Sequence, residues 1–246
     1  MQVKAIILGA DKGGNKIDKT PTIFKSICGV PLIRLLINTI QKVGVSDISV
    51  VVATQTKEAQ HIISPHKIVC QSVQLGTGHA VLSAHQALSS FDGCVLILFG
   101  DTPLIKERTL RRMIEKYEQG ADVVALGFIP ADTRRYGRMI MGPSGLEKIV
   151  EYKDATDIER TIRLCNSGVL CINGKHILNL VKGIKNDNNT GEYYITQVVE
   201  LAKKAGLTTD IVMSSAEELH GINSPEELEA AQELFLQSQL KDKKND

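Results

Sequence analysis

The chain has 246 residues, enough for one enzyme-sized α/β domain whose core needs neither disulfides nor a structural metal. Apolar residues make up 43%, charged residues 23%, and the formal net charge is +1, so no overall field favours nucleic acid or an anionic membrane. The five cysteines form no C-x-x-C pair, which predicts reduced, buried thiols rather than disulfides or a zinc site. No apolar run approaches the about 20 residues of a membrane span, so we expect a cytoplasmic protein.

The first half of the chain alternates between short β-branched runs and stretches with helical spacing. The expected strands are 3–8, 48–53, 67–70, 94–99 and 123–128. The expected helices are 32–43, 57–63, 79–88 and 107–119. Such alternation is typical of βαβ units, and strands apolar on both faces predict a Rossmann-like, mostly parallel sheet with helices on both faces.

The pattern changes after residue 128. Residues 139–141 and 147–152 flank a Gly-Pro-Ser-Gly turn and are expected to form an antiparallel hairpin. Further along the chain we expect a strand at 165–172, a helix at 193–205 and a strand at 209–213. This part is expected to form a small antiparallel lobe over the mouth of the sheet.

The sequence near residue 224 predicts the start of a helix. Ser224 is followed by Pro225 and two glutamates, which is the pattern of an N-cap, a first-position proline and an acidic first turn. We expect this helix to run to about residue 239, ahead of a charged tail.

A glycine-containing turn follows the first predicted strand at 9–14, at the carboxyl edge of the sheet, where open α/β sheets bind ligands. Glycines let backbone N–H groups approach phosphate oxygens. The turn is not a P-loop, because Asn15 stands where lysine is required and no serine or threonine follows Lys16. A purely structural turn remains the alternative.

Asp101 follows the most apolar predicted strand, 94–99, so its carboxylate is expected at the same edge of the sheet. A carboxylate at this place is a natural ligand for Mg²⁺, which takes one or two protein oxygens in nucleotide sites. An aspartate that only caps the turn at Thr102 and Pro103 is the alternative.

Eight blocks in a fixed order carry a specific resemblance, among them QLGTGHA, EYKDAT and GEYYIT. The blocks lie at residues 71, 74–80, 100–101, 136–138, 149–156, 166–168, 191–196 and 221–223. From residue 3 to about 235, the chain resembles the uridylyltransferase domains of bifunctional N-acetylglucosamine-1-phosphate uridyltransferases, the bacterial UDP-N-acetylglucosamine pyrophosphorylases.

The resemblance implies a nucleotide-diphospho-sugar transferase fold with a small antiparallel sugar-binding lobe. The nucleotidyltransferase domain would span residues 1–223, with a nucleotide-binding half at about 1–125 and a sugar-binding half at 126–223. The C-terminal helix and charged tail would occupy 224–246.

The resemblance also implies roles for matching residues on the nucleotide side. The uracil would be contacted by Gln71, Gly76 and Thr77. Mg²⁺ would be held against the phosphates by Asp101 and Asn223. The remaining nucleotide contacts would come from Leu8, Gly9, Ala10 and Gly100.

On the sugar side, the resemblance implies a pocket lined by Gly137, Glu151, Asn166 and Thr196. Glu151 would bind a hydroxyl group, and Asn166 would lie near the N-acetyl group. His79 starts a predicted helix, and we expect it to orient the loop and assign it no chemistry.

The first loop departs from the family pattern, which reads Leu-Ala-Ala-Gly-x-Gly-Thr-Arg-Met with a later Pro-Lys pair. Here Asp11 replaces a glycine, Asn15 replaces the arginine and Thr22 replaces the lysine. Loss of such a pre-positioned cation costs on the order of 3 kcal/mol in transition-state stabilisation.

Nearby lysines are candidates to replace the lost charge, although a lysine is a flexible point charge and not a bidentate fork. They are Lys12, Lys16, Lys19 and Lys25. We predict that Lys12 and Lys16 are catalytic together with Asp101.

The predicted function is transfer of a uridylyl group from UTP to N-acetylglucosamine 1-phosphate, giving UDP-N-acetylglucosamine, a precursor of peptidoglycan and the cell envelope, and pyrophosphate. The alternatives are a weakly active or inactive relative that binds nucleotide sugar, and a transferase for a different sugar phosphate. The expected cofactor is Mg²⁺ and the expected partners are small molecules, not nucleic acid or membrane. The chain is expected to be a monomer or a weak homo-oligomer, without acetyl transfer.

Overall fold

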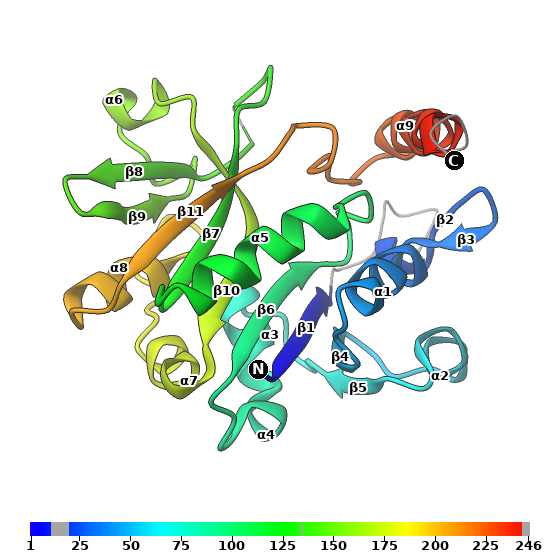
Figure 1. Cartoon of the computed structure of the whole chain (residues 1–246), viewed down its shortest axis with the longest axis horizontal. Helices are drawn as coiled ribbons and strands as arrows, with labels where there is room; N and C mark the ends of the chain where they lie inside the picture. Colours follow the sequence, from blue (N-terminus) through cyan, green and yellow to red (C-terminus); the bar gives the residue numbers. More distant parts are fainter. Residues whose placement is uncertain (11–19, 134, 243–246) are drawn as a thin grey trace.

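A mostly parallel sheet forms the centre of the molecule (Figure 1). The computed structural model describes residues 1–10, 20–133 and 135–242. Within these residues the sheet has nine strands, and its main path runs β11-β7-β10-β6-β1-β4-β5. The main-path strands are β1 (Val3–Gly9), β4 (Asp47–Val52), β5 (Lys67–Cys70), β6 (Cys94–Phe99), β7 (Val123–Phe128), β10 (Cys165–Asn173) and β11 (Thr209–Met213). Only β10 runs antiparallel to its two neighbours on this path.

Helices cover both faces of the sheet and separate its apolar strands from water. One face is covered by α1 (Leu32–Lys42), α2 (Lys57–Ile63) and α5 (Glu107–Glu118). The other is covered by α3 (Thr77–Ser83), α4 (His85–Leu88), α7 (Gly174–Lys182) and α8 (Gln197–Lys204). In α1, the buried residues Leu32, Ile33, Leu36, Ile37 and Ile40 form one stripe at helical spacing. The predicted fold class is confirmed.

The antiparallel lobe is a hairpin attached to the start of β10, at the upper left of Figure 1. It consists of β8 (Arg138–Gly142) and β9 (Gly145–Val150), and β8 also pairs with the start of β10. Gly145 closes the hairpin with φ +103, a conformation that favours glycine. The short helix α6 (Asp157–Arg160) follows, with a capping box between Thr156 and Glu159. The division of the chain near residue 125 stays a prediction.

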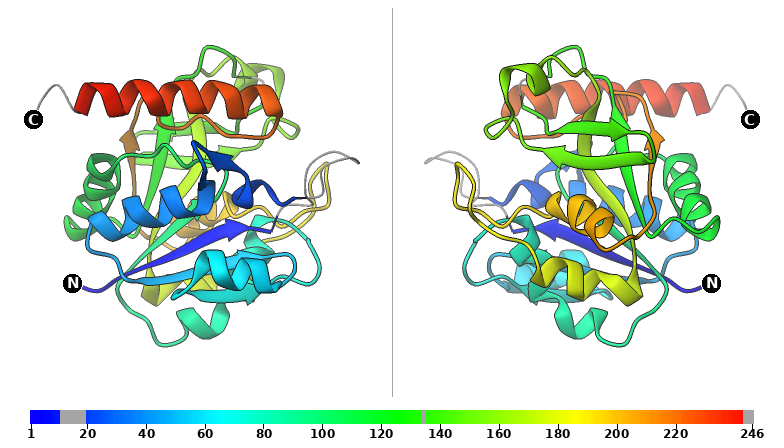
Figure 2. Two further views of the ribbon diagram at one scale, coloured as in Figure 1. Left: turned by 90° about the vertical axis from the view of Figure 1, so that its right-hand side faces the viewer. Right: turned by 90° about the vertical axis from the view of Figure 1, so that its left-hand side faces the viewer.

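The C-terminal helix α9 (Pro225–Asp242) lies along one side of the molecule (Figure 2). Its start is as predicted, because the Ser224 hydroxyl accepts from the backbone N–H of Glu227 at 3.2 Å. Ala231 of α9 packs against Ile222, Leu32 and Ile27. Ile27 belongs to a small ribbon of β2 (Ser26–Ile27) and β3 (Val30–Pro31), which follows the 3-10 helix η1 (Thr22–Phe24).

Two helix predictions are wrong, and one helix was not predicted. The helix expected at 79–88 is two helices, α3 and α4, because the chain leaves helical geometry at Ala84. The helix expected from residue 193 begins at Gln197, because residues 193–195 bond to the turn before α3. No helix was predicted at the position of α7, which follows β10 directly and has Asn173 as its N-cap.

All five cysteines are free thiols, but they are not all buried. Cys28 and Cys70 are exposed, which corrects the prediction for these two residues. Cys94 and Cys171 lie on the neighbouring strands β6 and β10 with their sulfur atoms 2.8 Å apart. Among the described helices, none combines the length and the apolar composition that a bilayer span requires.

We expect Gly174→Ala to destabilise the fold. A Cβ atom at residue 174 would lie 2.4 Å from the carbonyl oxygen of Phe91 and 2.9 Å from that of Gly93. Alanine is favoured over glycine in a helix by about 1 kcal/mol, but crowding a packed site costs roughly 1–3 kcal/mol, and the contact is with backbone that cannot turn away. The free energy of unfolding from urea titration should therefore fall by a net amount of about 1 kcal/mol.

The exposed neighbour Lys175 provides the control for this prediction, since Lys175→Ala should change stability by less than about 0.5 kcal/mol. A Gly174→Ala protein as stable as the unaltered chain would contradict the proposed collision.

Candidate active site

A cavity of about 410 Å³ lies at the carboxyl ends of β1, β5 and β6. Its lining includes eight residues predicted on the nucleotide side: Leu8, Gly9, Ala10, Gln71, Gly76, Thr77, Asp101 and Asn223. Six further lining residues were not predicted to contact a ligand: Thr22, Ile23, Gln74, Ala80, Phe99 and Glu192. The structure therefore brings residues from six separate parts of the chain to one edge of the sheet.

Two predicted glycines of this edge have a packing role. A Cβ atom on Gly9 would lie 2.6 Å from the Ile23 side chain, and one on Gly100 would lie 2.3 Å from it. Ile23 is buried and belongs to η1, which also carries Thr22. The missing side chains at 9 and 100 thus let η1 close over the ends of β1 and β6. Gly100 itself does not line the cavity.

The turn that carries Gly76 and Thr77 is joined to the segment 193–195. Tyr193 N–H donates to the carbonyl of Leu75 at 2.8 Å, and Gly78 N–H donates to the carbonyl of Tyr193 at 2.7 Å. Ile195 N–H donates to the Thr77 hydroxyl at 2.9 Å. Gly76 has φ +114, and a Cβ atom there would lie 2.7 Å from the Tyr193 carbonyl oxygen. Only glycine fits this position, since both the conformation and the space exclude a side chain.

Asp101 and Asn223 converge above Gly221. The Cβ position of Gly221 lies 3.9 Å from Asp101 Oδ2 and 3.5 Å from Asn223 Nδ2. The two segments are tied together by the backbone, because Ile222 N–H donates to the Asp101 carbonyl at 2.9 Å. A carboxylate oxygen and an amide oxygen on one cavity wall suit Mg²⁺. Among the described residues, no group of three or more His, Cys, Asp or Glu side chains could hold a metal ion.

Glu227 holds the backbone of Asn223. Its carboxylate accepts from the Asn223 N–H at 2.6 Å and pairs with Arg135. Burial alone would raise the pKa of Glu227, but the hydrogen bonds from Arg135 and Asn223 outweigh it and lower the pKa. The N-terminal turn of α9 thereby fixes the residue that faces Asp101.

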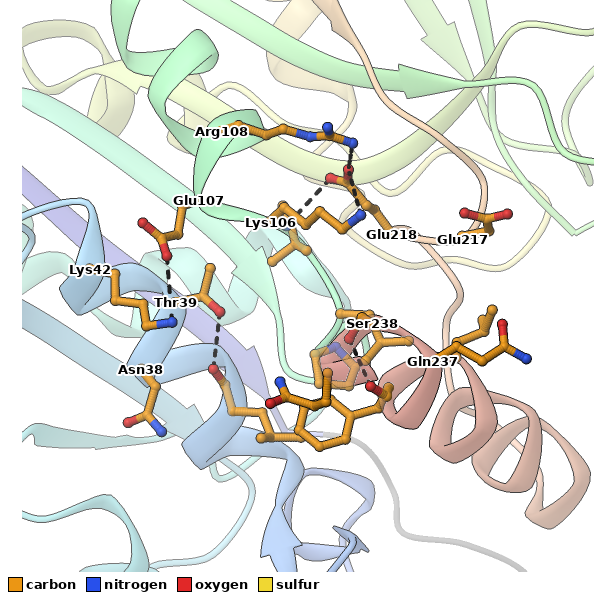
Figure 3. A pocket seen from close by; sticks show the side chains of 17 residues that line it. Asn38, Thr39, Lys42, Lys106, Glu107, Arg108, Glu217, Glu218, Gln237 and Ser238 are labelled. Atoms are coloured by element: carbon orange, nitrogen blue, oxygen red, sulfur yellow. Dashed lines mark hydrogen bonds and ion pairs between the residues drawn. The ribbon is translucent and has the colours of Figure 1, made fainter. Parts of the chain in front are cut away.

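Glu218 anchors the segment that leads to Asn223 (Figure 3). Its side chain is 1% exposed and accepts from Thr109 Oγ1 at 2.5 Å, Ser214 Oγ at 2.9 Å and Arg108 Nη2 at 3.0 Å. Burial raises the pKa of this carboxyl, but the bonds from Thr109, Arg108 and Ser214 prevail, so the net shift is downward. The sequence alone contains no signal for Glu218, because two of its partners, Arg108 and Thr109, are about 110 residues distant.

Glu218 also borders a second cavity, of about 630 Å³, between α1, the start of α5 and α9 (Figure 3). None of the predicted site residues lines it. Its charged residues are largely engaged with one another: Lys42 pairs with Glu107, and both Arg108 and Lys106 pair with Glu218.

The four residues predicted on the sugar side also lie together. Glu151 Oε1 accepts from Thr196 Oγ1 at 2.8 Å, and the Gly137 Cβ position lies 3.3 Å from Glu151 Oε2. Asn166 N–H donates to the Gly137 carbonyl at 2.9 Å. The Asn166 side-chain oxygen is buried and has no hydrogen-bond partner among the described residues. Burial raises the pKa of Glu151, and the bond from Thr196 only partly offsets this.

An orphaned buried oxygen and a buried carboxylate with a raised pKa are costly unless a ligand satisfies them. This second cluster meets the cavity through the segment 193–196, because Ile195 bonds to Thr77 and Thr196 bonds to Glu151.

Lys12 and Lys16, like Asp11, Asn15 and Lys19, lie outside the described residues. Thr22, which stands in place of the family lysine, lines the cavity.

Comparison with known families identifies a match to the MobA-like NTP transferase domain over residues 5–164. The chain is 44% identical over 241 residues to the bifunctional protein GlmU of Rhodospirillum rubrum, covering 97% of this chain and 54% of that protein. It is 41% identical to the GlmU of Roseobacter denitrificans over 96% of this chain and 53% of that protein. It is 38% identical to the GlmU of Bartonella quintana over 97% of this chain and 54% of that protein. The chain thus spans about half the length of the curated relatives it matches.

We expect Glu218→Gln to remove a pH-dependent part of the stability. The pKa of Glu218 is lower in the folded than in the unfolded chain, so its contribution is complete above the unfolded value of about 4.3 and is lost as the pH falls through the folded value. At pH 7 the variant should lose about 1.5–3 kcal/mol of unfolding free energy, the worth of hydrogen bonds to a charged group. Urea titrations from pH 7 to pH 3 measure this, with the two stability curves converging at the acid end.

Glu217→Gln alters an exposed neighbour and serves as the matched control. If the difference in unfolding free energy between the unaltered chain and Glu218→Gln stays constant from pH 7 to pH 3, the lowered pKa of Glu218 is contradicted.

Proposed function

The chain belongs to the family of MobA-like NTP transferase domains, and we propose that it is a uridylyltransferase which joins UTP and N-acetylglucosamine 1-phosphate. The products are UDP-N-acetylglucosamine and pyrophosphate. The observation that carries the proposal is the meeting of three sets of side chains at one edge of the sheet. Gln71 and Thr77 lie in the cavity with Asp101 and Asn223, and the Glu151–Thr196 pair adjoins them.

The arrangement gives each part of the substrates a separate wall. The turn at Gly76 receives the base, the end of β1 at Gly9 faces the phosphates, and Glu151 with Asn166 receives the sugar. A phosphate oxygen of the sugar 1-phosphate would attack the α-phosphorus of UTP in line, and pyrophosphate would leave without a covalent enzyme intermediate. Catalysis then depends on positioning and charge neutralisation.

In this proposal Asp101 and Asn223 hold Mg²⁺. The ion, when bound, neutralises charge on the phosphates. The backbone bond from Ile222 to Asp101 keeps the two ligating side chains together. Lys12 and Lys16, which precede the described part beginning at Thr20, are proposed to neutralise the leaving pyrophosphate in place of the family's arginine and lysine.

The proposed substrates are small soluble molecules, so the reaction requires neither nucleic acid nor a membrane. We propose that it takes place in the cytoplasm. It does not depend on association of the chain with itself. The buried cluster around Asn166 favours a sugar that carries a hydrogen-bond donor, such as the N–H of an acetamido group, because the orphaned oxygen can only accept.

Purified protein supplied with UTP, N-acetylglucosamine 1-phosphate and Mg²⁺ should release pyrophosphate. Chelation of the metal should abolish this release, and Asp101→Ala should lower kcat by at least about a hundredfold, as loss of a charge-stabilising group does. A coupled pyrophosphate assay measures both effects.

Binding of UDP-N-acetylglucosamine by calorimetry provides the companion measurement. Clear binding without any turnover would replace the proposed enzyme with a nucleotide-sugar-binding relative. Turnover with another sugar phosphate alone would keep the transferase and overturn the substrate.

Glu151→Gln should separate stability from activity. The pKa of Glu151 is raised in the folded state, so its ionisation lowers the stability as the pH rises above the unfolded value of about 4.3, and the loss is complete above the folded pKa. The amide removes this cost, and the variant should unfold at the same or higher urea concentration near neutral pH. It should also bind a sugar hydroxyl less well, so kcat/KM for the sugar phosphate should fall about tenfold while KM for UTP stays unchanged.

Glu233→Gln, at an exposed position of α9, is the control. A destabilised Glu151→Gln protein, or an equal loss for both substrates, would show that Glu151 does not act at the sugar.

A further inference from the structure

The Gln71 side chain is held in one orientation by two acceptors. Gln71 is 3% exposed, and its Nε2 group donates to the Gly76 carbonyl at 3.2 Å. The same nitrogen lies 2.9 Å from Nδ1 of His79. Both Nε2 protons therefore have a partner.

The donor and acceptor properties of these contacts determine the positions of Nε2 and Oε1 in the Gln71 amide. A backbone carbonyl only accepts, so the amide nitrogen and not the oxygen faces Gly76. An amide nitrogen only donates, so His79 Nδ1 accepts, and the proton of the neutral ring is on its Nε2. His79 thus contributes a lone pair, and the Gln71 amide cannot turn over without losing two hydrogen bonds.

The Gln71 oxygen is left for the ligand. No donor among the described residues reaches Gln71 Oε1, while Gln71 lines the cavity at the end of β5. Its backbone is fixed as well, because its N–H donates to the Val52 carbonyl at 2.8 Å. Gly76 is fixed by the Tyr193 backbone, which leaves no room for a side chain there. The cavity wall therefore presents a positioned hydrogen-bond acceptor.

We propose that His79 is a positioning residue for base selectivity: by accepting from Gln71 Nε2, it commits Gln71 Oε1 to accept from the base and so selects uracil over cytosine. Uracil carries a proton on its ring N3, whereas cytosine has a lone pair there. A fixed acceptor meets a donor in the first case and another acceptor in the second, and an unpaired buried polar group is a strong basis for rejection. The inference rests on the proposed function, because it assigns the base to the wall that carries Gln71.

Loss of the acceptor on His79 should reduce the selectivity for uracil over cytosine. In His79→Phe the ring volume is kept, but one Nε2 proton loses its partner. The amide is then free to rotate and to donate to the cytosine N3. A role for His79 in packing alone would weaken both nucleotides by the same factor.

Calorimetric titration of the purified chain with UTP and with CTP, each with Mg²⁺, tests the proposal. We expect the ratio of the UTP to the CTP affinity to fall at least about tenfold in His79→Phe, the worth of one buried hydrogen bond. His85→Phe, an exposed histidine on the neighbouring helix α4, should leave the ratio unchanged. In a Gln71→Ala background, His79→Phe should have no further effect on the ratio, because there is no amide to orient.

His79→Gln provides a second variant if the phenylalanine does not fold, since its side-chain oxygen still accepts and should keep most of the selectivity. An unchanged ratio in His79→Phe, or an equal change with and without Gln71, overturns the inference. Equal affinity of the unaltered chain for UTP and CTP overturns it while leaving a nucleotidyltransferase intact. Absence of binding to either nucleotide overturns the proposed function itself.

Discussion

The site depends on the backbone bonds that join the turn at 75–78 to the segment 193–195. These hydrogen bonds link residues more than a hundred positions apart, and they leave no space for a side chain at Gly76. On one side of this junction lies Gln71, and on the other lies Thr196 with its partner Glu151. Two of the three bonds join backbone groups only, and the third runs from the Ile195 N–H to the Thr77 hydroxyl, so most of the junction does not vary with side-chain rotamers. The walls that we propose for the nucleotide and for the sugar are thereby held in a fixed relation.

A second junction of the same kind holds Asp101 and Asn223. The Ile222 N–H bond to the Asp101 carbonyl closes the edge of the sheet, and two carboxylates support it from outside. Glu227 fixes Asn223 from α9, and Glu218 fixes the preceding segment on α5. Both carboxylates have a lowered pKa, so both supports persist at neutral pH and weaken only in acid. The helices α5 and α9 thus support the site, although none of their described residues lines the cavity.

The sequence predicts the strands well and the helix ends less well, for a physical reason. Strands such as β5, β6 and β7 are apolar runs between polar turns, and their bounds follow from composition. The break at Ala84 and the late start of α8 are set by tertiary contacts, which no local pattern records. The predicted residues of the cavity were found through ordered motifs. Glu192 lies within one of these motifs, GEYYIT, although no ligand contact was predicted for it. Glu218 lies in none of the motifs, and its place depends on how distant segments fold together.

The reversed direction of β10 has a consequence for how the lobe is built into the molecule. β10 begins beside the end of β7, at the ligand edge, so Asn166 reaches the site from the first residues of a strand and not from a loop after one. The chain leaves β7 and returns to β10 at nearly the same place, and the hairpin β8–β9 occupies the excursion between them. An insertion or deletion within that excursion leaves the register of β7, β10 and β6 intact. Changes in that excursion can therefore reshape the surface proposed to meet the sugar, while the strands proposed to bind the nucleotide stay constant.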